Sequence, residues 1–393
     1  MVEKNIALDP IELTAELIRC RTITPDEGGA LVILQDILTK ANFSCTRLDK
    51  NGVSNLFARW GKSKNGPSLC FNGHIDVVPT GDLQLWSQHP FSGKIENGLI
   101  YGRGATDMKS AVASFVAASL KFLEQTSPKG SIVIAITSDE EGPATDGTRA
   151  ILDWMNKNNE KIDHCLVGEP TSSKVLGDTI KIGRRGSITL MISVSGLQGH
   201  VAYPEKATNP IPPMTYLLES LIEEPLDTGN KHFEPSSLVV TSIDTGNKAD
   251  NIIPSSISSK VNIRYNDLQS KDSILVWIQN KIDVIRNKYD VKISLRYRNS
   301  AEPFIIKDRK FPDLLKSAIH RELNINAVTS TSGGTSDARF IKDVCPVLEF
   351  GLIGEKMHKI DESIEVTQIS ALTETYLKFI ELYFAQFESF KTK

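Results

Sequence analysis

The hydrophobic pattern of this chain changes twice along its length, and this limits the folds that it can adopt. Up to about residue 184, apolar runs such as "PSLCFNGHI" and "GSIVIAITSDEE" are unbroken and turn polar at their ends. Unbroken apolar strands are typical of parallel sheets that carry helices on both faces. Helices are expected between them, at 110–126 and 145–158. The first part therefore predicts an α/β fold with a mixed, mostly parallel sheet flanked by helices.

After residue 184, alternation replaces the unbroken runs. "SITLMISVSG", "SSKVNIRYND" and "DVKISLRY" place an apolar side chain at every second position. This alternation is typical of antiparallel strands with one solvated or separately covered face. Helical stretches near 210–223 and 271–289 lie between these strands. We therefore predict an inserted α+β domain with a four-stranded sheet over residues 185–298.

The helix–strand pattern resumes after the insertion. A helix is expected at 310–323, then an apolar strand, "CPVLEF", and a closing helix at 367–390. Residues 299–393 are therefore expected to complete the domain that residues 1–184 begin. A length of 393 residues agrees with two domains, because single hydrophobic cores stop growing beyond roughly 250–300 residues.

Composition argues against several classes of function. The net charge is −3 and there is no long basic block, so nucleic-acid binding has no electrostatic support. No segment approaches the roughly 20 apolar residues that a membrane span needs. The N-terminal stretch lacks a basic start followed by an apolar region, so no secretory signal is expected. Five scattered cysteines without a C-x-x-C pair indicate reduced thiols in a cytoplasmic protein.

Three of the predicted strands end in residues that can bind a metal. His74, the pair Glu140–Glu141 and Glu169 each follow an apolar run, and ligands of open α/β sheets gather at the carboxyl ends of the strands. A histidine near an aspartate, as in "HID", is common by chance, and a solvated loop could hold two adjacent glutamates. However, adjacent carboxylates repel one another unless a cation lies beside them.

Together with His74, Glu141 and Glu169, two further residues make a set of five candidate ligands. Asp107 follows the glycine-rich stretch "YGRGATD" at the start of a predicted helix, where the helix dipole by itself also favours a carboxylate. His358 lies near the C-terminus in "EKMHKIDE". Carboxylates with imidazoles suit zinc or a similar divalent ion. Five ligands are too many for one catalytic zinc, but they suit two ions, about 3.5–4 Å apart, that share one aspartate.

Two acidic residues remain beside this set, and we expect each to assist the chemistry. Glu140 is expected to act as the general base for a water molecule between the ions. Asp76 lies two residues beyond His74, and its carboxylate is expected to accept the other ring N–H of that histidine and fix its tautomer.

Six motifs, in this order, resemble the dinuclear zinc aminoacylase and carboxypeptidase family. They are "FNGHIDVVPTGD", "WSQHPFSGKIENGLIYGRGATDMKS", "TSDEEG", "VGEPTS", "IKIGRRGSITLMISVSGLQGHVAYP" and "TSGGTSDARF". The resemblance runs from about residue 8 to residue 380. It implies two zinc ions, for which cobalt can substitute, with these two ligand sets: His74, Asp107 and Glu169; and Asp107, Glu141 and His358. It also implies a catalytic domain of 1–184 with 299–393, and a lid of 185–298 that forms a homodimer interface.

The resemblance also implies roles in and around the lid. His200, in "GLQGHVAYP", is expected to reach the partner subunit's active site and stabilise an oxyanion, although a loop histidine that caps a strand explains its spacing equally well. Arginine in "GRRGS" suits a substrate with carboxylates, and a charged hinge between domains is the alternative. The expected substrate-binding residues are Arg184, Ser187, Tyr203, Asn251, Gly334 and Thr335.

The activity that the resemblance implies is metal-dependent hydrolysis of an amide. The expected reaction on a small molecule removes succinate from N-succinyl-LL-2,6-diaminopimelate, on the route to lysine and cell-wall precursors. Acetylornithine deacetylation and dipeptide hydrolysis remain alternatives, because Gly354 stands where many enzymes acting on the succinyl substrate carry asparagine. An inactive binding protein is disfavoured, since all five ligand positions and the base position are filled.

Overall fold

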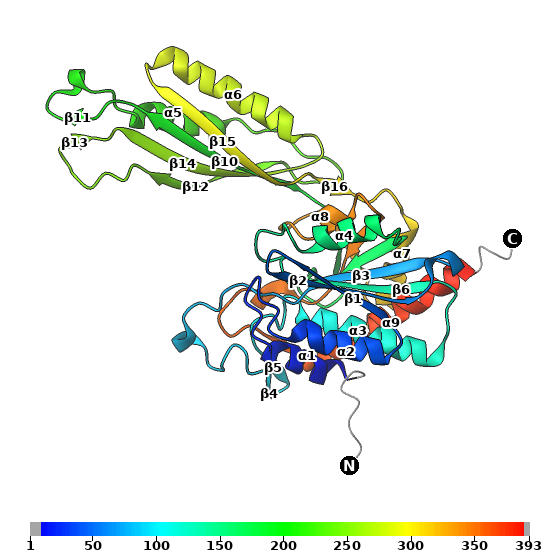
Figure 1. Ribbon diagram of the computed structural model, residues 1–393. Coiled ribbons are helices and arrows are strands. Elements are labelled where there is room, and N and C mark those ends of the chain that lie inside the picture. Colours follow the sequence, from blue (N-terminus) through cyan, green and yellow to red (C-terminus); the bar gives the residue numbers. More distant parts are fainter. Residues whose placement is uncertain (1–8, 389–393) are drawn as a thin grey trace. The chain divides into compact units, whose positions relative to one another are not determined.

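The computed structural model describes residues 9–388, and the chain divides into two compact units (Figure 1). The first unit contains the chain up to Ile182, Ile306–Ser330 and the part that begins at Ser336. The second contains Gly183–Ile305 and Thr331–Thr335. The second unit extends beyond the expected range 185–298 at both ends, because two short strands pair antiparallel there. These strands are β9 (Gly183–Arg184) and β16 (Phe304–Ile305).

An eight-stranded mixed sheet forms the centre of the first unit. Its strand order is β1-β2-β6-β3-β7-β18-β8-β17. The neighbours β6, β3, β7 and β18 run parallel, whereas β1 and β2 are antiparallel at one edge. The strands are β1 (Ser44–Lys50), β2 (Val53–Gly61), β3 (Ser68–His74), β6 (Ser131–Thr137), β7 (His164–Val167), β8 (Thr179–Lys181), β17 (Val328–Ser330) and β18 (Val347–Glu349). This sheet confirms the predicted fold class.

Helices cover both faces of this sheet, as the unbroken apolar strands predicted. Every residue of β3 and of β6 is buried. In Figure 1, α1, α2 and α3 lie along one face of the sheet and α4 lies on the other. The helices are α1 (Pro10–Arg19), α2 (Ala30–Lys40), α3 (Lys109–Gln125), α4 (Thr148–Lys157), α7 (Lys310–Leu323), α8 (Ala338–Ile341) and α9 (Val366–Glu388). The helix expected at 367–390 corresponds to α9, and its last two residues lie outside those that the structure describes.

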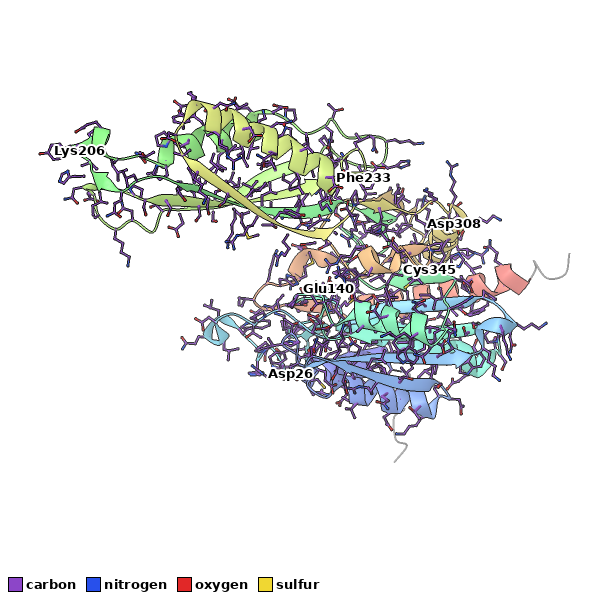
Figure 2. The ribbon with its side chains drawn as sticks, turned by 45° about the horizontal axis from the view of Figure 1, so that its top comes forward. Asp26, Glu140, Lys206, Phe233, Asp308 and Cys345 are labelled. Atoms are coloured by element: carbon purple, nitrogen blue, oxygen red, sulfur yellow. The ribbon has the colours of Figure 1, made fainter. Side chains whose placement is uncertain are left out.

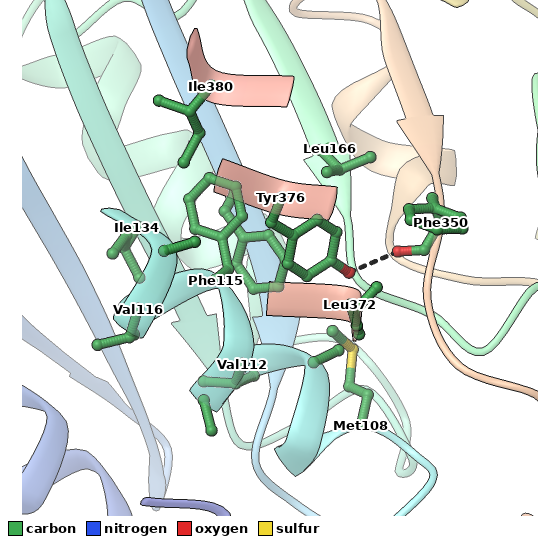
Figure 3. Packing of buried hydrophobic residues seen from close by; sticks show 14 of the residues in the cluster. Met108, Val112, Phe115, Val116, Ile134, Leu166, Phe350, Leu372, Tyr376 and Ile380 are labelled. Carbon is green, nitrogen blue, oxygen red and sulfur yellow. Dashed lines mark hydrogen bonds between the residues drawn. The ribbon is translucent and has the colours of Figure 1, made fainter. Parts of the chain in front are cut away.

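Aromatic rings pack the core between the sheet, α3 and α9 (Figure 3). The rings of Phe71 and Phe115 stack with their centroids 4.3 Å apart, and the ring of Tyr376 meets Phe115 edge-on at 5.5 Å. The buried hydroxyl of Tyr376 donates a hydrogen bond to the main-chain carbonyl of Phe350 at 2.6 Å, as the dashed line in Figure 3 shows. The ring is therefore buried without leaving its polar end unpaired.

The second unit is built on a four-stranded antiparallel sheet, as its alternating sequence predicted. The strand order is β12-β14-β10-β15, and apolar side chains of β10, such as Leu190 and Ile192, pack against two helices. The elements are β10 (Gly186–Ser195), β12 (Ser237–Asp244), β14 (Ser256–Tyr265), β15 (Lys292–Ala301), α5 (Ile211–Glu223) and α6 (Lys271–Lys288). A two-stranded sheet of β11 (Gly199–His200) and β13 (Ile252–Ile253) belongs to the same unit.

A small three-stranded sheet completes the described strands. It consists of β4 (Lys94–Glu96), β5 (Leu99–Tyr101) and β19 (Ser363–Glu365), in the order β19-β5-β4. This sheet joins the loop that leads to Asp107 with the segment that follows His358. Among the helices of residues 9–388, none has both the length and the apolar composition that crossing a bilayer requires.

Candidate metal centre and active site

Three neighbouring parallel strands bring their polar ends to one edge of the sheet. His74, the last residue of β3, lies opposite Thr137, the last residue of β6, and Asn72 lies opposite Val167 at the end of β7. The segments that follow β6 and β7 therefore leave the sheet beside His74, as expected at the carboxyl ends of parallel strands. Figure 2 labels Glu140, in the loop after β6, among the side chains of the first unit.

Two glycines allow Asp107 to approach these strand ends. The next residue, Met108, is fully buried. A Cβ atom added at Gly73 would lie 2.7 Å from Cε of Met108, and one added at Gly168 would lie 2.6 Å from the same atom. The methionine therefore packs in the space that both glycines leave, which anchors the neighbouring Asp107 beside the ends of β3 and β7. The aspartate precedes α3 by two residues, whereas the sequence analysis placed it at the helix start.

Asp107 lies between two imidazoles and is the residue shared by two ligand groups. Its Oδ1 is 3.2 Å from Nε2 of His74, and its Oδ2 is 3.2 Å from Nε2 of His358. Nε2 of His74 also lies 3.9 Å from Oε1 of Glu169, and Nε2 of His358 lies 2.7 Å from Oε1 of Glu141. In each group, ligand atoms of all three residues lie within 4.8 Å of one another. The structure thus brings together all five residues expected to bind metal.

Two buried atoms at the centre of this cluster have no hydrogen-bond partner. They are Nε2 of His74 and Oδ1 of Asp107, and these side chains are 2% and 8% exposed. Buried polar atoms are almost always hydrogen-bonded, so a nitrogen and an oxygen that face each other at 3.2 Å without hydrogen-bonding need an explanation. Imidazole nitrogens and carboxylate oxygens are the donors that zinc prefers together. The residues therefore fit two divalent ions that share Asp107.

A third group of side chains could also hold an ion. It contains His74, Glu140 and Glu141, again with ligand atoms within 4.8 Å of one another. Glu140 is therefore close enough to act either as a ligand or as a proton acceptor beside the ligands. It is absent from both groups that contain Asp107.

The charges of the cluster favour a cation at its centre. Burial lowers the pKa of His74, but the nearby carboxylates, first of all that of Asp107, together outweigh this effect and leave that pKa well above its usual value. The carboxylates of Asp107 and Glu141 raise the pKa of His358 to about 10. Burial raises the pKa of Asp107, yet the two imidazoles hold it below its usual value. These shifts all express attraction of the carboxylates for positive charge.

Glu140 differs from its neighbours in the direction of its shift. Burial, and then the charge of Glu169, raise its pKa well above the usual value for a glutamate. A carboxylate with a raised pKa is a stronger proton acceptor, which suits a general base that works near neutral pH.

Asp76 does not make the contact that the sequence analysis expected of its carboxylate. Nδ1 of His74 lies 2.9 Å from the main-chain carbonyl oxygen of Asp76, whereas the nearer carboxylate oxygen is 3.7 Å away. The carboxylate instead accepts the main-chain N–H groups of Glu140 at 3.2 Å and Glu141 at 3.1 Å. The expectation was therefore wrong about which atoms of Asp76 make the contact. Its main-chain carbonyl orients the histidine, and its carboxylate holds the loop that carries both glutamates.

Asp139 is a residue of this loop that the sequence analysis did not single out. Its buried carboxylate accepts the main-chain N–H groups of Ala144, Thr145 and Asp146, at distances of 2.9–3.1 Å. These bonds turn the chain back immediately after the two glutamates. A third acidic residue in the run "SDEEG" was the signal that could have identified it.

His200, Tyr203 and Asn251 lie together in the second unit. Nδ1 of His200 accepts the N–H of Ala202 at 3.0 Å, so the neutral ring carries its proton on Nε2 and can donate it. The rings of His200 and Tyr203 are 5.9 Å apart. Asn251 joins them because its carbonyl accepts the N–H of Val201 at 3.1 Å.

The remaining expected substrate-binding residues also belong to the second unit. They are Arg184, Ser187, Gly334 and Thr335. The guanidinium of Arg184 lies against the loop that contains Gly334 and Thr335. Its Nη1 donates a hydrogen bond to the carbonyl of Ser332 in this loop at 3.3 Å. Ser187 lies opposite Arg264 in the ladder of β10 and β14. Arg264 is a second cation that the sequence analysis did not select, since it sits inside an ordinary alternating strand.

Comparison with known proteins places these residues in a family context. Residues 70–382 match the peptidase family M20/M25/M40. The chain is 49% identical over 377 residues to a succinyl-diaminopimelate desuccinylase of Cereibacter sphaeroides, with 96% of this chain and 99% of the relative covered. It is 50% identical over 378 residues to the enzyme of the same name from Paracoccus denitrificans, with the same coverage.

Solved structures with low sequence identity share the fold. An M20-family metallo-carboxypeptidase of Sulfolobus solfataricus has a TM-score of 0.78 at 16% identity, over 96% of this chain and 99% of its own. A Bacillus subtilis protein described as a dinuclear metal-binding M20 peptidase has a TM-score of 0.74 at 14% identity, over 97% and 99% of the two chains.

Proposed function

Since this chain belongs to the peptidase family M20/M25/M40, we propose that it is a metal-dependent hydrolase that removes succinate from N-succinyl-LL-2,6-diaminopimelate. The observation that supports hydrolysis is Asp107, which lies in two ligand groups at once. The succinyl substrate is supported by desuccinylases that are 49% and 50% identical over almost their whole length. An enzyme of this biosynthetic step would act in the cytoplasm.

Zinc is the proposed ion in both groups, and cobalt is the proposed substitute. One ion would be held by His74, Asp107 and Glu169, and the other by Asp107, Glu141 and His358. When bound, two such ions polarise the amide carbonyl and lower the pKa of a water molecule. The main-chain carbonyl of Asp76 holds Nδ1 of His74 as the N–H donor, which leaves the lone pair of Nε2 directed at the cluster.

Glu140 is the proposed proton carrier. Its carboxylate takes a proton from the attacking water and later gives that proton to the nitrogen of the departing amine. The raised pKa of Glu140 supports this role, and so does its absence from both groups that contain Asp107. The hydrogen bond from its N–H to Asp76 keeps its main chain in place.

The second unit is proposed to bind the carboxylates of the substrate and to stabilise the oxyanion. Arg184 offers a planar fork that binds a carboxylate through two hydrogen bonds. Nε2–H of His200 is the proposed oxyanion donor, since Nδ1 is occupied as an acceptor. The other proposed contacts are Ser187, Tyr203, Asn251, Gly334 and Thr335.

We also propose that the second unit is a lid and that it joins two chains into a homodimer. Its sheet has edge strands, β12 and β15, and an open edge is a ready place for pairing with another copy. In such a dimer His200 would complete the active site of the partner subunit.

A substrate comparison tests the proposed function. Purified protein, first stripped of metal and then loaded with zinc, would be assayed on N-succinyl-LL-2,6-diaminopimelate, N-acetylornithine and an unmodified dipeptide under identical conditions. The succinyl substrate should give the highest kcat/KM by at least about tenfold, which corresponds to about 1.4 kcal/mol of transition-state binding. Faster hydrolysis of the acetyl substrate would favour a related deacylase, which Gly354 before the last histidine leaves open.

A further inference from the structure

Glu362 is a buried carboxylate that holds the loop of Asp107 through its backbone. It is fully buried. Its Oε1 accepts main-chain N–H groups of Gly104 at 3.1 Å, Thr106 at 2.9 Å and Asp107 at 3.2 Å. Hydrogen bonds to an ionised acceptor are about twice as strong as neutral ones. Three N–H groups of the short segment before α3 are therefore held by one carboxylate oxygen.

Arg103 connects this carboxylate to the segment of His358. Its Nη1 donates to Oε2 of Glu362 at 2.8 Å and to the carbonyl of Lys359 at 2.9 Å. The guanidinium also lies over the ring of Trp86, with its carbon 5.2 Å from the ring centroid. A planar group with several fixed donors can serve both acceptors at once, which a lysine ammonium does less well.

The segment of His358 needs such support because its backbone is not relaxed. His358 has a φ of 62° and Asp361 has a φ of 55°. Non-glycine residues rarely occupy this left-handed region, and they persist there only when surrounding contacts hold them. The bond from Arg103 to the carbonyl of Lys359 lies between these two positions.

We propose that Glu362 and Arg103 are positioning residues that clamp the loop of Asp107 to the segment of His358. The clamp sets the affinity for the ion of the Asp107–Glu141–His358 group. The clamp has a weaker effect on the ion of the His74–Asp107–Glu169 group. Only Asp107 of that group lies in the clamped loop, and its other two ligands come from the ends of β3 and β7. This inference rests on the metal site of the proposed function.

The proposal is tested by titrating metal-free protein with Zn²⁺ and following the heat of binding. Two backgrounds isolate the two groups: Glu169→Ala leaves the group of His358, and His358→Ala leaves the group of His74. Adding Glu362→Gln, which keeps the shape but removes the charge, should weaken Zn²⁺ binding about 10- to 100-fold in the first background. In the second background the change should stay below about threefold.

Hydrogen–deuterium exchange of the metal-free protein tests whether Glu362 holds the backbone of the Asp107 loop. The N–H groups of Gly104, Thr106 and Asp107 should exchange with deuterium faster in Glu362→Gln than in the wild type, while peptides from β2 and β6 exchange unchanged. Arg103→Lys should reproduce both effects more weakly, because it keeps the charge and loses the fork. If Glu362→Gln fails to fold by circular dichroism, Arg103→Lys and Glu362→Asp decide the question.

Two matched controls separate the clamp from general loss of stability. Glu365→Gln changes an exposed glutamate three residues further along, in the adjoining strand β19. Arg59→Lys changes another buried arginine, which forms an ion pair with the carboxylate of Glu160 and donates a hydrogen bond to the main-chain carbonyl of Lys161. Both controls should bind Zn²⁺ like the wild type.

Three outcomes would overturn the clamp. The first is a folded Glu362→Gln protein that binds Zn²⁺ with wild-type affinity. The second is an equal loss of Zn²⁺ affinity in both backgrounds. The third is a loss of Zn²⁺ affinity in Arg59→Lys as large as that in Arg103→Lys. A wild-type protein that binds no Zn²⁺ at all would instead remove the proposed metal function, and the inference with it.

Discussion

Nε2 of His358 lies 2.7 Å from Oε1 of Glu141. The contact joins the loop after β6 to the segment before β19, on either side of the whole second unit in the sequence. The ligand group is therefore assembled from distant parts of the chain, and those parts are held by residues other than the ligands, such as Asp76 and Glu362. This division makes single substitutions informative, because a change at one ligand leaves the others in place.

Asp107→Ala should remove both ions, whereas Glu169→Ala and His358→Ala should each remove one. The reason is that Asp107 alone of these three residues belongs to both groups. Elemental analysis after dialysis against a fixed Zn²⁺ concentration would count the ions per chain. Uptake of one ion by the aspartate variant, at the wild-type affinity, would contradict the shared role.

Glu140→Gln should keep both ions and lose hydrolysis by about 10²–10⁴-fold, since the amide cannot accept the proton of water. Glu141→Ala should instead weaken binding of one ion, because its Oε1 belongs to the group of His358. Turnover with saturating Zn²⁺ and ion content would be measured for both proteins. Loss of an ion from the glutamine variant would mean that Glu140 is a ligand, as the group with His74 and Glu141 also permits.

Removal of metal should lower thermal stability as well as activity. The four carboxylates of the cluster repel one another, and an ion that binds the folded chain stabilises it by about 2.7 kcal/mol at a free concentration 100 times its Kd. Thermal unfolding would be recorded with a chelator and after Zn²⁺ is restored. The His358→Ala protein is the control, and it should regain a smaller part of the stability. Identical melting curves with and without the chelator would argue against bound ions.

Arg184→Met should lower kcat/KM for the succinyl substrate by about 10- to 100-fold, because a hydrogen-bonded charge pair contributes about 1.5–3 kcal/mol. Hydrolysis of the acetyl substrate, which has no carboxylate on its acyl group, should change less. Arg185→Met is the matched control from the adjacent residue, whose side chain bonds Ser237 instead. Equal losses on both substrates would show that Arg184 acts through folding of the unit.

Mixing two inactive proteins, Glu140→Gln and His200→Ala, should restore activity. In a mixed dimer that exchanges His200 between subunits, one site carries both defects and the other carries neither. In a fully exchanged equal mixture of two-fold dimers, about half of the chains would be in mixed dimers. Because one of the two sites in each mixed dimer is intact, activity should recover to about a quarter of the wild-type value. No recovery despite verified exchange would place His200 within its own active site.

Much of the fold followed from the hydrophobic pattern. The buried strands β3, β6 and β7 and the alternating strands β10, β14 and β15 leave clear patterns in the sequence, so the sequence predicted both kinds of sheet. β12 was not located because its apolar residues lie on both faces: Leu238 and Val240 are partly buried, whereas Val239 and Ile243 are exposed. A strand with apolar residues on both faces shows no alternation in its sequence.

The candidate site was predictable where its chemistry lies in side chains at strand ends. The structure brings the five expected ligand residues together, and their binding of metal remains a prediction. The contacts of Asp76 and Glu362 were not predictable, because their carboxylates bond to main-chain N–H groups. Every non-proline residue offers such a group, so these partners leave no pattern in the sequence.

The place of β18 in the sheet has a consequence for how the protein is made. This strand lies between β7 and β8 although it is synthesised long after both. A ribosome adds about 5–20 residues per second and releases the chain from its N-terminus onward. During translation β7 and β8 therefore lack the strand that pairs with both of them until the whole second unit has been synthesised. Until β18 arrives, the strand edges that will flank it stay unpaired, and unpaired strand edges make a folding chain prone to aggregation.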